Sequence, residues 1–429
     1  MTNPITILYN KYKSNFFIQR FFKLLSVDIL VKISGIVLLP VYLHLMSQEE
    51  FGYFNYWISI VGVMGFLNLG LYVGQSKLFH DYSDTEKKGE LLFTIYATLF
   101  VFLLGLFIIL YLFKLDIKLF SLLVKNTAST DFPRLTLLMV IFIGVISFML
   151  MNFLVTSEQI RKIQKYNLLR LFLVNIFSIG ALYLIKNDAI TRLRAAFFIE
   201  GILFLYFVKY LLRYMVYSYN IAILKKSFLL GLPILLNAIY GIFTNFSDKY
   251  FLEKYGTYTD LSIYYLAFSI ASIIQFAFVS LQNVWLPLFF KEKDFNINKS
   301  RTISLMKKIS VVFVIFFIIV MLGTKVLLVM NIVPSKYSEV IKVLPIVLFT
   351  QLMIGFTSLM GNFLIAFEKT ISIVYIGLIV SGISVVCNMY LVPRFNIYGA
   401  ALGSLIVNTA YFGFFYAYSL YYYKKKNGK

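Results

Sequence analysis

Long apolar runs, separated by short polar segments, dominate the chain. The runs are typically 18 to 25 residues long, and about 20 apolar residues in a helix cross the roughly 30 Å hydrocarbon core of a bilayer. A membrane β-barrel would instead show alternating apolar and polar residues in segments of about ten. The pattern therefore predicts an all-α integral membrane protein.

About twelve spanning helices fit the runs, with boundaries that follow the loss of hydropathy at each end. The expected spans are 24–46, 56–75, 91–113, 135–156, 168–185, 195–217, 228–252, 261–290, 309–330, 339–367, 371–391 and 398–423.

Composition supports lipid as the main solvent of this chain. Hydrophobic residues make up 60% of its 429 positions, and the mean hydropathy is +0.83. The longest polar segments, 114–134 and 291–308, are too short for a folded catalytic domain. We therefore expect a protein that works inside the membrane and is not an enzyme.

The loops also predict an orientation. With the N-terminus placed in the cytoplasm, the inside segments hold 23 Lys and Arg residues and the outside segments hold 10. Cytoplasmic loops of membrane proteins are enriched in these residues, so both termini are predicted inside. This topology and the attraction of basic residues to anionic lipid account for the formal charge of +21, so nucleic acid is not an expected partner.

The chain divides naturally at a short cytoplasmic segment. We expect an N-terminal six-helix lobe at 1–217, a linker at 218–227 and a C-terminal six-helix lobe at 228–429. The aromatic-rich stretch 51–60 at the start of the second span resembles 261–270 at the start of the eighth. An even number of helices in each lobe permits a parallel repeat, with a pseudo-twofold axis along the membrane normal.

Polar side chains inside the spans are the candidate functional residues, because an amide facing lipid loses its hydrogen bonds. In the seventh span, Asn237, Gly241, Asn245 and Asp248 recur at steps of four, four and three, which places them on one stripe. Lys249 is expected to point about 100° away from Asp248. Asp248 lies near the outer end, so a solvated position at the rim also stays open for it.

Other spans add single polar residues and pairs. Gln275 and Gln282, seven apart, share a face of the eighth span, and Asp28 and Lys32, four apart, share a face of the first. Glu200 and Lys209 are candidates to line a cavity, whereas Arg170 is expected to reach the cytoplasmic surface. Isolated amides are expected to bond helices together, and among them are Gln351, Asn362, Asn388 and Asn408.

No metal or cofactor site is expected. The chain has one cysteine, Cys387, and two histidines, His44 and His80, without further ligands close by in the sequence. A weaker hypothesis is a Na+ or proton site made of Asn245, Asp248 and Asn388.

Several short stretches, in order along nearly the whole chain, resemble polysaccharide-unit flippases of the Wzx type, which serve O-antigen and capsule synthesis. They are Gly35–Pro40, Ser47–Tyr53, Leu67–Leu71, Gly231–Pro233, Ser247–Leu252, Phe367–Thr370, Asn388, Leu391–Pro393 and Tyr398–Ala401.

This resemblance implies a two-lobed, twelve-helix exporter of the multidrug/oligosaccharidyl-lipid/polysaccharide superfamily in a bacterial cytoplasmic membrane. Its members move undecaprenyl-pyrophosphate-linked oligosaccharides to the outer leaflet by alternating access, with coupling to Na+ or H+. Polysaccharide polymerase machinery would be a partner. From their spacing on shared helix faces, and not from the resemblance, we expect substrate contacts at polar residues of the spans: Asp28, Lys32, Asn237, Asn245, Asp248, Lys249, Gln275 and Gln282.

Two alternatives stay open at this point. A multidrug exporter of the same superfamily would share the lobes and differ in the chemistry of its cavity. From another class, a polytopic polysaccharide polymerase or acyltransferase would need a catalytic group, and the sequence offers no Ser/His/Asp or paired-carboxylate arrangement.

Overall fold

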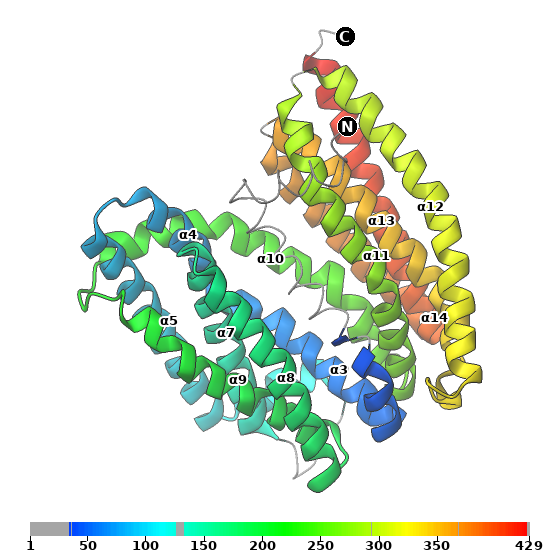
Figure 1. Cartoon of the computed structure of the whole chain (residues 1–429), viewed down its shortest axis with the longest axis horizontal. Coiled ribbons are helices and arrows are strands. Elements are labelled where there is room, and N and C mark those ends of the chain that lie inside the picture. The colour runs from blue at the N-terminus through cyan, green and yellow to red at the C-terminus, as the bar shows by residue number, and fades with distance from the viewer. Residues whose placement is uncertain (1–33, 36, 126–132, 293, 368, 427–429) are drawn as a thin grey trace, which may run out of the picture. The chain divides into compact units, whose positions relative to one another are not determined.

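A computed structural model describes residues 34–35, 37–125, 133–292, 294–367 and 369–426. Within these ranges the chain is helical and contains no strand (Figure 1). The prediction of an all-α membrane fold is therefore confirmed.

The helices follow one another with short connections. After a helical stretch at 34–35 and 37–45 come α3 (Gln48–Val63), the 3-10 helix η1 (Met64–Asn68), α4 (Leu71–Asp81), α5 (Thr85–Leu112), α6 (Leu115–Leu123), α7 (Arg134–Thr156), α8 (Ile160–Leu184), α9 (Ala189–Leu212), α10 (Ile221–Tyr255), α11 (Tyr258–Lys291), α12 (Phe295–Val329), the 3-10 helix η2 (Ser335–Tyr337), α13 (Val340–Ala366) and α14 (Thr370–Lys426).

The spans of the described residues agree with the expected number. Nine helices are long and apolar enough to cross a membrane, and α3 with η1 and α4 forms a tenth span that bends by 49°. The long α14 covers two expected spans, separated by a break at Asn396, which has φ 47° and ψ −122°. Of the first expected span, only residues 34–35 and 37–46 are described, and they are helical as far as residue 45.

Two differences from the expected spans have local causes. The second span is broken, because Leu69 and Gly70 both adopt positive φ angles of 55° and 70°. The segment 114–134, which is expected outside, contains the short helix α6, which is anchored by Asp116. Its buried carboxylate accepts hydrogen bonds from Arg134 at 2.6 and 2.8 Å.

The described residues form two compact units, which we treat separately. Unit 1 comprises the described parts of Met1–Leu45, Met64–Phe120 and Thr127–Leu235; unit 2 comprises Met46–Val63, the described part of Ser121–Asn126, and that of Leu236–Lys429. In unit 1, α9 packs against α7 and α8, and α4 packs against α5 and α7. In unit 2, α13 packs against α11, α12 and α14, and α3 packs against α11.

These units do not follow the chain order expected for the lobes. Helix α3 joins unit 2, where Ser59 shares a hydrogen bond of 2.7 Å with Tyr265 of α11. The boundary between the units also falls inside α10, after Leu235. The predicted lobes at 1–217 and 228–429 stay a prediction.

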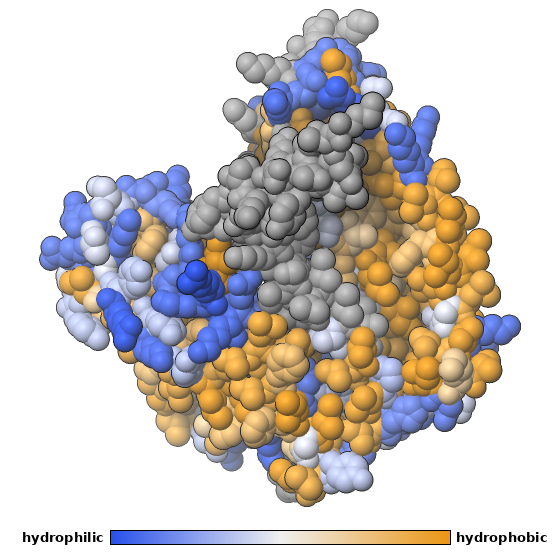
Figure 2. Space-filling view, in the orientation of Figure 1, coloured by the Kyte–Doolittle hydropathy of each residue, from blue (hydrophilic) through white to orange (hydrophobic). Residues whose placement is uncertain are grey.

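Large apolar side chains cover much of the outer surface. Leu184 is 83% exposed and Val329 is 79% exposed, and broad apolar areas are visible in the space-filling view (Figure 2). Water-soluble monomers rarely expose contiguous apolar patches of more than a few hundred Å². The surface is therefore that of a protein surrounded by lipid.

Helix starts are set by side chains that accept hydrogen bonds from free backbone N–H groups. Asp188 caps α9 by accepting from the Thr191 N–H at 2.7 Å. Thr257 and Asp260 form a reciprocal capping box at the start of α11, with Oγ1 of Thr257 accepting from the Asp260 N–H at 3.1 Å. These caps satisfy donors that would otherwise lie unpaired at the ends of spans.

Thr257→Ala is expected to lower the free energy of unfolding by about 1 kcal/mol, the usual cost of losing an N-cap. Thermal unfolding in detergent measures this change. Thr257→Ser keeps the hydroxyl and is the control. Equal losses in the two variants would contradict a capping role.

Candidate functional site

A polar cavity of about 370 Å³ lies inside unit 2. Four helices form its wall: α10, α11, α13 and α14. Their polar contributions are Asn245, Gln275, Thr357, Ser358, Asn362, Asn408 and Tyr411. The remaining lining residues are glycine, isoleucine and phenylalanine.

Most of the cavity's polar side chains are held by their own helix. The Asn245 side-chain amide donates to the Gly241 carbonyl at 2.9 Å, and that of Asn408 donates to the Ser404 carbonyl at 2.8 Å. The Thr357 hydroxyl donates to the Met353 carbonyl at 2.9 Å. Such bonds to the preceding turn fix each side chain without using a second helix.

Several hydrogen-bonding atoms remain available on the wall. Within the described part of the chain, the Oδ1 atoms of Asn245 and Asn408 accept no hydrogen bond, and the Gln275 amide makes none. The Tyr411 ring lies edge-on to Phe415, with ring centres 5.0 Å apart. The cavity therefore offers amide acceptors, one free amide that both donates and accepts, and aromatic surface.

Among the residues that the structure describes, no charged side chain lines this cavity. Amides and hydroxyls bind neutral polar groups by directional hydrogen bonds, whereas an organic cation in a dry site requires a carboxylate or an aromatic cage. The wall is better matched to the hydroxyl groups of a sugar than to a cationic drug.

A buried charged cluster adjoins the cavity. Asp248, only 2% exposed, accepts hydrogen bonds from the Tyr264 hydroxyl at 2.5 Å and from the Ser404 hydroxyl at 2.9 Å. Lys249 forms an ion pair with Asp248 at 3.2 Å, and its ammonium lies 5.3 Å from the centre of the Phe268 ring. The carboxylate thus has three side-chain partners, as a buried charge requires.

Two hydrogen bonds connect this cluster to the cavity wall. Lys249 donates to the backbone carbonyl of Asn245 at 2.7 Å, and Asn408 donates to the backbone carbonyl of Ser404. Asn245 and Asn408, which both line the cavity, are therefore each joined by one hydrogen bond to a residue that touches Asp248.

The structure brings some of the predicted site residues together. Asn245 and Gln275 line the cavity, and Gln282 accepts from the Asn362 amide at 3.1 Å beside it. The Asn237 side chain and the Tyr411 hydroxyl both lie beside Gly377. Asp28 and Lys32 lie outside the described residues.

Two predictions about the charged pair differ from what is seen. Asp248 is buried rather than solvated at a rim, because the end of α10 continues to Tyr255 and α11 and α14 cover it. Lys249 does not point away from Asp248, because its long side chain folds back along α10 to the carboxylate.

The three residues of the weaker cation hypothesis have separate surroundings. Asn245 lies on the cavity wall, Asp248 lies in the charged cluster, and Asn388 donates to Ser247 Oγ at 2.9 Å between α14 and α10. Among the residues with described positions, no group of three His, Cys, Asp or Glu side chains could hold a metal ion. A Na+ or proton site made of these three residues stays a prediction.

Unit 1 contains a buried carboxylate within a predicted span, Glu200, whose partners were only partly anticipated. Glu200 of α9, 6% exposed, accepts from the Tyr166 hydroxyl at 2.5 Å and pairs with Arg170 at 2.7 Å. Arg170 was expected to reach the cytoplasmic surface. The i, i+4 spacing of Tyr166 and Arg170 was the available signal for a shared partner.

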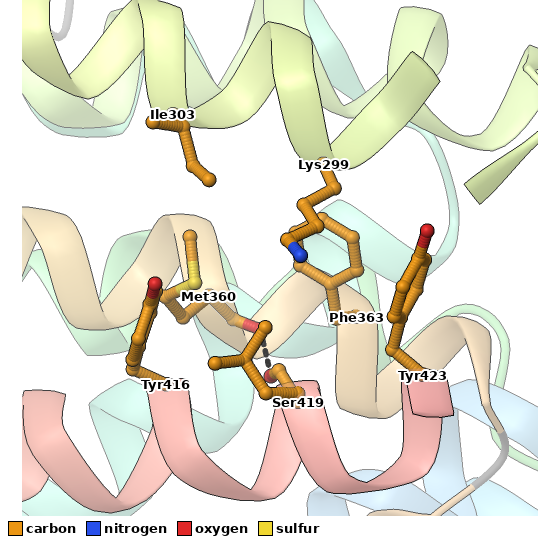
Figure 3. A pocket seen from close by; sticks show the side chains of 8 residues that line it. Lys299, Ile303, Met360, Phe363, Tyr416, Ser419 and Tyr423 are labelled. Atoms are coloured by element: carbon orange, nitrogen blue, oxygen red, sulfur yellow. Dashed lines mark hydrogen bonds between the residues drawn. The ribbon is translucent and has the colours of Figure 1, made fainter. Parts of the chain in front are cut away.

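A further pocket lies where α12 approaches α13 and α14, between Lys299, Phe363, Tyr416 and Tyr423 (Figure 3). It holds only about 20 Å³, the room that one water molecule needs. This pocket is too small for a substrate.

Comparisons with known proteins agree with this architecture. A family model described as "Polysaccharide biosynthesis protein" matches residues 17–293. No curated protein has a sequence that matches the chain.

Two solved structures resemble the whole chain. An inward-facing multidrug resistance MATE family transporter of the MOP superfamily has a TM-score of 0.72 at 14% identity, covering 94% of this chain and 96% of its own. The lipid II flippase MurJ, in an inward closed conformation, has a TM-score of 0.70 at 17% identity, covering 91% of this chain and 86% of its own. At such identities the likeness concerns the fold.

Proposed function

Since the chain belongs to the polysaccharide biosynthesis protein family, we propose that it is a flippase for undecaprenyl-pyrophosphate-linked oligosaccharide repeat units. It moves the saccharide from the cytoplasmic to the outer leaflet of a bacterial cytoplasmic membrane by alternating access. Both termini are cytoplasmic, and a polysaccharide polymerase on the outer side uses the product.

The uncharged amide cavity of unit 2 is the observation that carries this proposal. Each sugar hydroxyl that enters hydrocarbon without a hydrogen bond costs about 2–7 kcal/mol. The free Oδ1 atoms of Asn245 and Asn408 and the amide of Gln275 replace water for such hydroxyls, and Tyr411 and Phe415 offer aromatic surface to the sugar ring. The protein lowers the crossing barrier and leaves the covalent structure of its cargo unchanged.

The multidrug exporter remains the second candidate, because the MATE transporter shares the fold over nearly the full length. Drug sensitivity of a deletion strain separates the two: a flippase deletion loses surface polysaccharide without becoming drug-sensitive.

Coupling to Na+ or H+ is part of the proposal. The candidate for this role is Asp248, a buried carboxylate that accepts from the hydroxyls of Tyr264 and Ser404 and whose partners Lys249 and Ser404 also hydrogen-bond to two residues of the cavity wall. Flipping that is independent of both the Na+ and the pH gradient would contradict ion coupling.

Gln275→Leu is expected to lower the flipping rate roughly tenfold, the effect of losing one substrate hydrogen bond of about 1.4 kcal/mol. Its amide has no partner among the described residues, so the fold should not change. Reconstituted vesicles with a lipid-linked oligosaccharide, or restoration of surface polysaccharide in a deletion strain, measure the rate.

Asn55→Leu is the matched control. Asn55 is likewise an amide on a helix of unit 2, but its side chain bonds to the Phe51 carbonyl and does not line the cavity. A normal rate in Gln275→Leu, or an equal loss in both variants, would exclude the cavity as the saccharide path.

A further inference from the structure

A second, quite different groove lies on unit 1, over α9 and between α7 and α8. It has a volume of about 850 Å³. Its walls are almost wholly apolar, with Phe177, Phe197 and Phe198 among them, and its floor includes Gly180, Ala181 and Ala195. Phe198 and Leu184 are 66% and 83% exposed, so the groove is open to the surroundings of the protein.

The groove faces away from the first helix of the unit. On α8, Asn175 accepts from the Tyr42 hydroxyl of that first helix at 2.8 Å. Groove residues of α8, such as Phe177 and Leu184, lie about 180–200° around the helix from Asn175. The groove is therefore on the side of α8 where lipid is expected.

One end of the groove is polar and cationic. Arg194 lines it there and donates from Nε to the Thr136 hydroxyl at 3.1 Å. Of the nearby basic residues, Arg134 is paired with Asp116 and Lys186 with Asp188. Arg194 has no carboxylate partner among the described residues, and its terminal nitrogens remain available.

The position of this end and the depth of the groove match one leaflet. Arg194 and Thr136 follow segments that the charge distribution predicts to be outside. From Thr136 to Ile143 the groove extends about 10 Å along α7 at 1.5 Å per residue, within the roughly 15 Å of one leaflet's hydrocarbon. The guanidinium of an arginine such as Arg194 forms bidentate hydrogen bonds with phosphate oxygens.

We propose that this groove binds the polyprenyl pyrophosphate carrier in the outer leaflet, with Arg194 on the pyrophosphate and the isoprenoid chain along α7, α8 and α9. This inference rests on the proposed function, because that function delivers such a lipid to the outer leaflet. The small floor residues leave width for a methyl-branched chain between the aromatic walls. The site would retain the flipped carrier after its saccharide has left the cavity of unit 2.

Gly180 offers a way to close the groove without disturbing the fold. A Cβ atom added there meets no atom within 4 Å, so Gly180→Trp fills the groove with its indole ring. Gly105→Trp on α5 is the matched control, because it also has open space and lies outside the groove. Arg194→Gln removes the charge and keeps a polar side chain.

The experiment is binding of undecaprenyl pyrophosphate to the purified full-length protein, measured by native mass spectrometry, with phosphatidylglycerol and undecaprenol as competing probes. We expect the pyrophosphate to bind in preference to both, about tenfold more weakly in Arg194→Gln, not at all in Gly180→Trp, and normally in Gly105→Trp. Equal binding of phosphatidylglycerol, or binding that is unchanged in Arg194→Gln and Gly180→Trp, would overturn the proposal.

Flipping of a lipid-linked oligosaccharide is assayed in parallel to separate the two proposals. If the wild-type protein flips the oligosaccharide, and both groove variants bind undecaprenyl pyrophosphate as the wild type does, the groove proposal is wrong and the flippase proposal stands. Groove-dependent binding without any flipping means that the protein carries the lipid site but not the proposed transport.

Discussion

Asp248→Ala is expected to cause one of the largest losses of stability that a single substitution can produce in unit 2. The change leaves the Lys249 ammonium, 15% exposed, without its carboxylate, and removes the acceptor of the Tyr264 and Ser404 hydroxyls. Breaking a buried ion pair from one side costs about 3–5 kcal/mol. Thermal unfolding in detergent measures the loss, and flipping should fall below detection.

The double variant Asp248→Ala with Lys249→Met tests the cause. Methionine has nearly the length of lysine without the charge, so the buried unpaired ammonium disappears. We expect this double variant to regain more than half of the lost stability, while the single Lys249→Met still leaves an unpaired carboxylate and remains destabilised.

The single and double variants also distinguish a structural role of Asp248 from a role in ion coupling. If the carboxylate of Asp248 couples an ion gradient to transport, the stable double variant still fails to flip its substrate. A double variant that flips normally would show that the pair only stabilises unit 2, and a double variant no more stable than Asp248→Ala would contradict the ion-pair explanation.

The spans could be predicted because a bilayer imposes one requirement on every helix. An apolar run of about 20 residues has no other stable arrangement in lipid, so the all-α fold and the spans followed from hydropathy alone. The break at Gly70 was not anticipated, because it is set by the backbone angles of Leu69 and Gly70 and not by hydropathy.

The candidate site was only partly predictable for a related reason. Asn245 and Gln275 were expected because a membrane amide must find a hydrogen bond. Asn362 and Asn408 were assigned to helix packing, since spacing within one helix says nothing about which helices meet. Tyr411 carries no polar periodicity and gave no signal.

Charged side chains were the least predictable, because their length lets them turn back along the helix. Lys249 was placed by the direction of its Cα–Cβ bond, and its ammonium instead reaches Asp248. Arg170 likewise pairs with the buried Glu200, while its own side chain stays 57% exposed. For lysine and arginine, the available partner determines the position of the charge more than the helical angle does.

A second large effect is expected where two backbones touch in unit 1. Gly70, at the break between η1 and α4, and Gly231 of α10 are so close that a Cβ on Gly231 would lie 2.3 Å from the Gly70 carbonyl oxygen, and a Cβ on Gly70 would lie 2.5 Å from that of Gly231. Both clashes involve backbone atoms, which cannot rotate away. Gly231→Ala is therefore expected to lower stability by about 1–3 kcal/mol, the usual cost of overpacking.

Gly70→Ala is expected to be worse, because its φ of 70° adds a strain of about 1–2 kcal/mol for a residue with a Cβ atom. Thermal unfolding of both variants measures the order of the two effects. Gly65→Ala in η1 is the control, since an added Cβ meets nothing within 4 Å. The contact between Gly70 and Gly231 joins the broken span to α10 next to Pro233. A substitution that displaces this contact should therefore also slow flipping in any variant that still folds.

Normal stability and flipping in Gly231→Ala would mean that the two backbones are free to separate, and that this contact does not fix the position of α10 in unit 1.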